Sequence, residues 1–442
     1  MSMSIKVSVC QLSSVIGSFL IQLTLGGAYA YNEFSYYFAT ENVTQNIQKA
    51  QFIFGVGMFG LSSSMGFGGY METSFNPCLI ILTGSFIMNL GLIITSFTYH
   101  TLWAIATYGF ICGVGAGLIY SVCLAVTSKL FTRFTGLILG VMVSGFSLGP
   151  ILINLISKYL IDVKDRSKIF IICPMILLGI QWLGVFLIWI ALKYSKKILP
   201  CNFILCSNEN RFIQVSDFVD DHISEVPVIN GVTDVEPHKM LVQYHFWILW
   251  IVFAMNSFGT ILIIQLHRIL EIIPCGLSFS QNITSNHNEY LYGNSYCSFF
   301  GRIIWGALIS FLPPKIVFMF MCFGSSVIYF VSVSFFQTQK KYEIIVSICC
   351  GWLSGNFSII PLFVLKRFGP NHFASNFGIM WTSYSFAGIL TSIFLEEMGQ
   401  HLRMTMNFFG SMSILSFILL FIYREKSGQL GKGIFDNFKF SY

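Results

Sequence analysis

The sequence predicts an all-α polytopic membrane protein with twelve transmembrane helices arranged as two six-helix bundles. Two observations predict this class. The 442 residues are 55% hydrophobic and only 10% charged, with a mean hydropathy of +0.72, which is far more apolar than a soluble domain. The apolar residues also gather into runs long enough to cross a bilayer, which takes about 20 residues. A net charge of +6, spread along the chain, indicates no nucleic-acid-binding patch.

Polar residues separate the apolar runs and give the limits of each predicted span. The twelve spans are expected at residues 9–31, 50–70, 77–98, 102–127, 136–157, 169–192, 244–267, 290–312, 315–336, 343–365, 373–395 and 405–423.

One long hydrophilic stretch divides these spans into two groups of six. It opens with Lys193, Lys196 and Lys197 and then becomes acidic. We therefore expect an N-terminal bundle at 1–192, a cytoplasmic linker at 193–241, a C-terminal bundle at 242–424 and a cytoplasmic tail at 425–442. This layout is typical of secondary transporters built from repeats, whose substrate sites lie near the midplane.

The distribution of Lys and Arg predicts that both termini are cytoplasmic, because most basic loop residues then lie inside. The fifth connection, with Lys158 and Lys164, is an exception. Two glycosylation sequons, at Asn42 and Asn282, fall in loops that this topology places outside. We expect an integral protein of the plasma membrane rather than of an organelle membrane.

Arg302 is a lone cation deep within an apolar segment. A guanidinium at that depth costs at least ~2.5 kcal/mol and stays charged, so it indicates a functional site by default. An anion-binding site is the favoured interpretation, and an internal pairing that holds helices together is the alternative. Arg302 and Tyr384 lie about twelve and eleven residues into their spans, near the centre of a ~30 Å core.

The sequence offers no set of residues for catalysis or metal binding. Most cysteines lie in apolar segments, where Cys serves as a small hydrophobe, and Cys201 and Cys206 alone are too few for a zinc site. No Ser-His-Asp arrangement occurs in the spans. We therefore expect neither an enzyme nor a bound cofactor or metal.

Glycines recur at helical spacing in the fourth and fifth spans. Such small residues let helix backbones approach closely. The residues assigned to packing and gating are Gly113, Gly117, Gly136, Gly140, Gly145 and Gly149.

The string that runs from Gly113-Val-Gly115-Ala-Gly117-Leu-Ile-Tyr120 to Gly149-Pro150 resembles the major facilitator superfamily. Within it, the string is similar to the monocarboxylate porters and the oxalate–formate antiporters. Gly301-Arg302-Ile-Ile-Trp-Gly306 resembles the motif whose Arg binds the substrate carboxylate in that group. The stretch that begins at Ala374 in the eleventh span resembles a motif of the antiporters, and the stretch that begins at Gly27 in the first span resembles a motif of the porters. The resemblance implies a major facilitator fold and transport by alternating access.

Departures from the family pattern narrow the expected substrate. Tyr384 stands where the antiporters have a second cation, so one full positive charge remains and a monocarboxylate fits best. Asn32 replaces the porters' Lys, and Ser298 replaces their Asp. Those two groups carry the proton in that family, so the replacements leave proton coupling open. Most residues of the superfamily's loop motif, which locks the cytoplasmic gate in relatives, are replaced here. Glu72 stands at the acidic position of that motif and is assigned to gating by the resemblance.

These observations predict a secondary transporter of a small organic anion, such as pyruvate or lactate, with a proton or an exchanged anion as the second partner. A carrier of another carboxylate-bearing nutrient such as an amino acid, or a non-transporting sensor on a transporter fold, is the alternative. The predicted substrate-binding residues are Arg302, Tyr384, Ser298, Tyr29, Tyr120, Asn356, Asn32 and Trp381.

Overall fold

The computed structural model describes residues 2–28, 47–97, 100–131, 134–160, 166–198, 234–272, 287–335 and 339–423. These residues are almost entirely helical and contain no strand. The helices of the first half are α1 (Ser2–Leu25), η1 (Gly26–Ala28), α3 (Ile47–Glu72), α4 (Pro77–Thr95), α5 (Thr101–Ala104), η2 (Ile105–Ile111), α6 (Cys112–Ser128), α7 (Thr135–Leu160) and α8 (Arg166–Ile198). The second half contains α9 (Pro237–Leu241), α10 (Tyr244–Ile272), α11 (His287–Phe311), α12 (Pro314–Phe335), α13 (Gln339–Leu353), α14 (Gly355–Phe368), α15 (Phe373–Gln400) and α16 (Leu402–Ile422).

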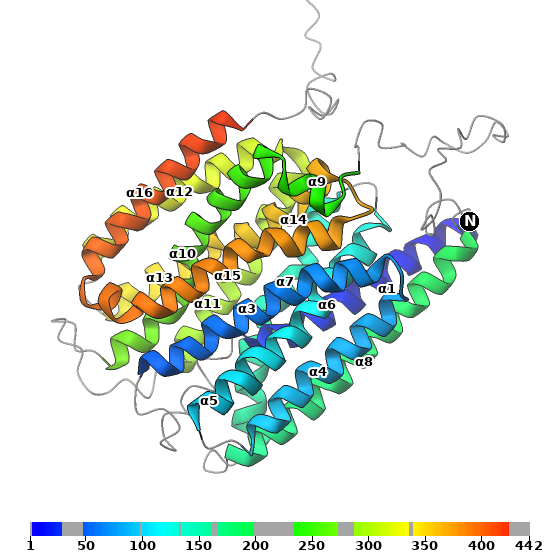
Figure 1. Cartoon of the computed structure of the whole chain (residues 1–442), viewed down its shortest axis with the longest axis horizontal. Coiled ribbons are helices and arrows are strands. Elements are labelled where there is room, and N and C mark those ends of the chain that lie inside the picture. The colour runs from blue at the N-terminus through cyan, green and yellow to red at the C-terminus, as the bar shows by residue number, and fades with distance from the viewer. Residues whose placement is uncertain are drawn as a thin grey trace, which may run out of the picture.

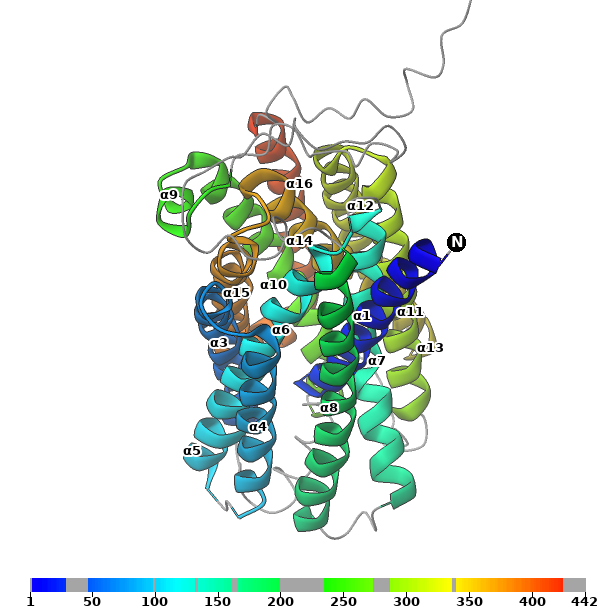
Figure 2. The same cartoon turned by 90° about the vertical axis from the view of Figure 1, so that its right-hand side faces the viewer.

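The long helices run side by side as a bundle of two halves (Figures 1 and 2). If α5–η2–α6 and α13–α14 each count as one helix, the described residues hold six long helices before residue 199 and six after residue 233. Ten of them are long and apolar enough to cross a membrane. The other two are α1, with a shorter apolar stretch, and α11, where polar residues accompany Arg302. The predicted all-α, twelve-helix class is confirmed.

Two of the spans are interrupted in ways that the hydropathy pattern did not predict. The fourth contains the π-helical segment η2, a rare geometry often found at functional sites. The tenth breaks at Ser354, between α13 and α14. Pro361 in α14 cannot donate a backbone hydrogen bond and crowds the preceding turn, while Gly369, with a φ of 89°, ends the helix.

The two halves meet along the helix pairs α3–α15 and α7–α11 (Figure 1). In the first pair, a Cβ at Gly69 would collide with the Ser375 backbone, and a Cβ at Gly378 would collide with the Gly66 backbone. In the second pair, a Cβ at Gly140 would lie 2.9 Å from the Cα of Gly306. Only glycine permits backbones to approach so closely, so these positions set the spacing of the halves.

Hydrogen bonds between the halves hold α7 and α11 together along their length. Ser310 accepts from the backbone N–H of Leu137 at 2.7 Å, near the start of α7. Tyr292 donates to Asn154 at 3.0 Å, near the other end. Because both ends of this helix pair are bonded, the structure represents a state in which α7 and α11 are closed on each other.

The end of the predicted linker packs on the turn between α14 and α15. Asp234 accepts hydrogen bonds from the backbone and side chain of Asn371, at 3.0 and 2.7 Å. Asn376 donates to the carbonyl of Val235 at 2.8 Å. The hydrogen bond from Lys239 of the following helix, α9, lowers the pKa of Glu236, which directly precedes that helix. Residues 199–233, the middle of the linker, lie outside the described residues.

Candidate functional site

Arg302 lies in the middle of the bundle, where α11 meets α7 and α14. Its side chain is 2% exposed. Nη1 donates to the backbone carbonyl of Val143 at 2.6 Å, and Nε has no hydrogen-bond partner. The guanidinium carbon lies 4.3 Å from the ring centre of Phe357 and 5.6 Å from that of Phe146. Aromatic faces stabilise this cation, but its donor groups retain capacity for an anion.

Aromatic side chains from both halves surround Arg302. Tyr384 and Trp381 of α15 pack on Phe357, with ring centres 5.5 and 5.7 Å from it. Tyr120 of α6 lies 5.1 Å from Trp381 by the same measure. The group that we call the central cluster consists of Arg302, Tyr120, Phe146, Phe253, Phe357, Trp381 and Tyr384.

Phe357 lies between the two residues that the sequence assigned to the carboxylate. It contacts the Arg302 guanidinium on one side and the Tyr384 ring on the other. Arg302 and Tyr384 are both buried and share Phe357 as a neighbour.

Two of the predicted polar ligands differ in their surroundings. Ser298, one turn from Arg302, shares a hydrogen bond of 3.1 Å with Ser147 of α7. Asn356 is 1% exposed, and neither its amide nitrogen nor its oxygen has a partner among the described residues. A buried amide left unpaired costs free energy, so Asn356 has unused capacity to bind a ligand or a water molecule.

The remaining predicted ligands, Tyr29 and Asn32, lie outside the described residues. Sequence reasoning missed Phe146 and Phe357, which touch the guanidinium, and Gln22 of α1, whose buried amide is also unpaired. An amide side chain within an apolar span is a signal that the sequence itself displays. The two phenylalanines carry no such signal among the 46 of the chain.

The predicted packing glycines divide between two roles. Gly136 and Gly140 of α7 face α11, across the boundary between the halves. The others pack within the first half: Gly113 and Gly117 against α3, and Gly145 and Gly149 against α1 and the Gly26 that follows it. Close packing is thus observed at all six, whereas a role in motion stays a prediction.

Glu72 ends α3 and pairs with Lys129 of the same half, with 2.6 Å between Oε1 and Nζ. The Glu72 side chain is 6% exposed, so the carboxylate is largely buried and Lys129 compensates its charge. The contact joins α3 to the end of α6 and does not cross between the halves. A role for Glu72 in gating stays a prediction.

Replacing Glu72 by Gln is expected to lower the free energy of unfolding by about 1 kcal/mol, because Lys129 loses its partner. Denaturation of the purified protein in detergent measures this change. The double variant Glu72→Gln/Lys129→Met is expected to recover part of the loss. Equal stability of the single variant and the parent would show that the ion pair contributes nothing.

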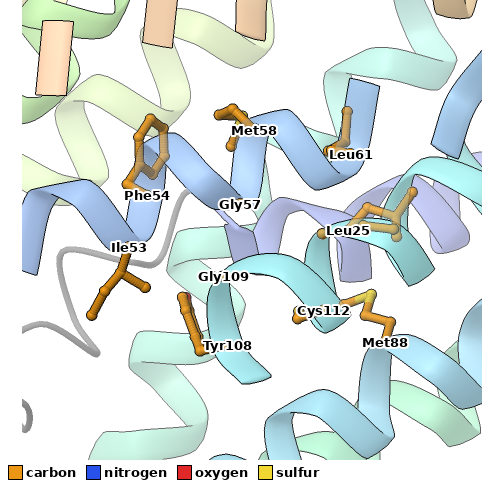
Figure 3. Close-up of a pocket in the computed structure, with 12 residues that line it drawn as sticks. Leu25, Ile53, Phe54, Gly57, Met58, Leu61, Met88, Tyr108, Gly109 and Cys112 are labelled. Carbon is orange, nitrogen blue, oxygen red and sulfur yellow. The ribbon is translucent and has the colours of Figure 1, made fainter. Parts of the chain in front are cut away.

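A small cavity of about 20 Å³ lies away from Arg302, inside the first half (Figure 3). Apolar side chains from α1, α3, α4 and the η2–α6 region line it, among them Leu25, Phe54, Met58 and Met88. No charged side chain lines this cavity, so it does not suit a carboxylate. The structure also shows no group of His, Cys, Asp or Glu side chains suited to a metal among its described residues.

A family model described as the Major Facilitator Superfamily matches residues 7–392. The chain belongs to the major facilitator superfamily. It is therefore a multi-pass membrane transporter and not an enzyme.

Individual relatives are distant. The chain is 22% identical to the Apicoplast pyruvate carrier 1 of Toxoplasma gondii over 73% of its own length and 65% of the carrier's. It is 26% identical to Monocarboxylate transporter 9 of Gallus gallus over 25% of its length and 22% of that protein's. The chain thus spans about two thirds of the pyruvate carrier.

A solved structure of the proton:xylose symporter XylE, bound to 6-bromo-6-deoxy-D-glucose, has the same fold. The TM-score is 0.63 at 11% sequence identity, over 95% of this chain and 96% of that one. At this identity the likeness concerns the fold alone.

Proposed function

We propose that this major facilitator transporter carries a small monocarboxylate, such as pyruvate or lactate, across the membrane by alternating access. The observation that supports the proposal is the single guanidinium of Arg302, buried between the two halves with one donor group unpaired. One positive charge matches one carboxylate, and Arg is suited to bidentate binding of that group. Two relatives named for pyruvate and for monocarboxylates are consistent with this substrate class.

The roles within the site follow from the surroundings of each residue. Arg302 binds the carboxylate, and Tyr384 and Asn356 orient the rest of the molecule. The aromatic rings of the central cluster exclude water, which strengthens the interaction with the anion. Gly136 and Gly140 let α7 and α11 approach closely when the site closes.

Counterflow by the purified protein in liposomes tests the proposal. Vesicles loaded with unlabelled pyruvate are expected to accumulate labelled pyruvate transiently, and vesicles loaded with a neutral amino acid are not. Accumulation driven by the amino acid instead would favour an amino acid carrier. Ligand-induced thermal stabilisation without counterflow by any acid would favour a sensor.

An imposed pH gradient is expected to leave the initial rate of pyruvate uptake unchanged. Within the described residues, neither the central cluster nor the polar groups beside it (Gln22, Ser147, Ser298 and Asn356) include a carboxyl or an imidazole. We therefore propose exchange of anions as the mode of transport, because these side chains offer no carboxyl or imidazole to carry a proton. The measurement compares uptake with equal internal and external pH against uptake with an acidic exterior. Stimulation by external acid would contradict exchange and indicate proton coupling.

We further propose that 1–192 and 242–424 are the two moving bundles, joined by a cytoplasmic linker at 193–241. Both termini, including the tail at 425–442, are proposed to lie in the cytoplasm. The protein is proposed to reside in the plasma membrane. Protease protection of tags at the two termini in intact cells tests the topology, and cell-surface biotinylation tests the membrane. Digestion of either tag from outside would contradict this orientation.

A further inference from the structure

Gln22 is a neutral polar side chain buried in the last turn of α1. Its side chain is 0% exposed, and both Nε2 and Oε1 lack a hydrogen-bond partner among the described residues. A buried amide that neither donates nor accepts is unusual, because most such groups find a partner. It is also costly, so it calls for a specific explanation.

The contacts of the preceding turn show which way Gln22 faces. Ser18, four residues earlier, hydrogen-bonds Thr127 of α6 at 2.6 Å. The carbonyl of Phe19, three residues earlier, lies against Gly145 of α7. Residues three and four apart share a helix face, so Gln22 faces the boundary between α6 and α7.

Two side chains of the central cluster lie at the boundary between α6 and α7. Tyr120 of α6 and Phe146 of α7 pack there with ring centres 5.8 Å apart. The Phe146 ring in turn lies 5.6 Å from the guanidinium carbon of Arg302. Gln22 is thus a polar group of the first half placed toward the cation of the second half.

Apart from Asn356, the other buried amides among the described residues have at least one structural partner. Gln181 of α8 accepts a hydrogen bond of 2.8 Å from Asn89 of α4. Asn256 of α10 donates to the Val252 carbonyl at 2.9 Å. Among the described residues, Gln22 and Asn356 are the glutamine and asparagine whose buried amide atoms are both unpaired. Helix packing alone therefore does not explain them.

We propose that Gln22 determines substrate specificity by binding the oxygen on the carbon next to the carboxylate. This inference rests on the proposed transport of monocarboxylates and narrows it to 2-oxo and 2-hydroxy acids. The amide nitrogen donates to a keto oxygen, and the amide oxygen accepts from a hydroxyl group, so one side chain serves both kinds of acid. The carboxylate binds Arg302 of one half and the neighbouring oxygen binds Gln22 of the other.

The test is competition against labelled pyruvate counterflow by the full-length protein in liposomes, with lactate and propionate as competitors. Lactate carries a hydroxyl group on the second carbon, and propionate carries no oxygen there. Lactate is expected to compete at a roughly tenfold lower concentration than propionate, the effect of one hydrogen bond. In Gln22→Leu, lactate and propionate are expected to inhibit at equal concentrations. The variant weakens the binding of lactate, which loses a hydrogen bond, and leaves the binding of propionate unchanged.

Gln181→Leu is the matched control, since it removes a buried amide of the same half that has a partner. It is expected to lower the melting temperature and keep the preference for lactate. Gln22→Leu is expected to melt at or above the parental temperature, because it removes an unpaired group. If a variant transports too slowly, thermal stabilisation by the same acids reports the same preference.

Equal competition by lactate and propionate in the parent, or an unchanged preference in Gln22→Leu, overturns the role of Gln22 and leaves monocarboxylate transport intact. Absence of counterflow with every acid in the parent overturns the proposed function, and this inference, which rests on it, falls with it.

Discussion

Replacing Arg302 by Gln is expected to reduce pyruvate counterflow by at least about a hundredfold. The carboxylate would lose two charge-assisted hydrogen bonds, each worth about 1.5–3 kcal/mol, and 1.4 kcal/mol corresponds to a factor of ten. Protein yield is expected to persist, because the guanidinium makes one hydrogen bond within the described structure and leaves Nε buried without a partner. Initial rates in liposomes of matched protein content measure the effect.

Two further variants separate charge from geometry. Arg302→Lys keeps the charge but lacks the planar, two-pronged donor, so an intermediate loss of roughly tenfold is expected. Arg367→Gln removes another buried guanidinium of the second half, outside the central cluster, and is expected to keep the parental affinity for pyruvate. Parental counterflow in Arg302→Gln would show that Arg302 is a structural residue.

The second large effect is expected at the boundary between the halves. Gly140→Leu places a side chain where even a Cβ would lie 2.6 Å from the Arg302 carbonyl oxygen and 2.9 Å from the Cα of Gly306. The closed arrangement of α7 and α11 then becomes inaccessible without a backbone shift. Turnover is expected to fall by roughly five- to 150-fold, because overpacking costs about 1–3 kcal/mol each time α7 and α11 close.

Gly179→Leu is the matched control for this prediction. A Cβ at Gly179 of α8 would have no atom within 4 Å, so a side chain there meets open space on the bundle surface. Turnover and melting temperature are expected to match those of the parent. A parental rate in Gly140→Leu would mean that the transport cycle does not pass through the close approach of α7 and α11.

The fold and part of the site were predictable because they depend on local features of the sequence. Long apolar runs specify membrane helices, and the cost of a deep charge singles out Arg302. Tyr384 was found because it stands where the antiporters have a second cation, and Trp381 because it lies three residues before Tyr384 on the same helix. Both lie in the central cluster.

The residues that sequence reasoning missed are those whose role depends on distant partners. Phe357 is one apolar side chain among many until α14 brings it over the guanidinium. Gly66, Gly69 and Gly378 form no long stripe within one helix, and their importance appears when α3 meets α15. Gln22 was recognisable as a polar group in an apolar span, but only the packing of α1 shows that its amide has no partner.

The central claim is that Arg302 binds the carboxylate of the substrate, and direct binding tests it apart from transport. Pyruvate is titrated into the purified protein in detergent, with thermal stabilisation as the signal, for the parent, Arg302→Gln and Arg367→Gln. Saturable stabilisation is expected in the parent and in Arg367→Gln, with the half-saturating concentration raised at least tenfold in Arg302→Gln. Saturation of Arg302→Gln at the parental concentration would contradict the claim.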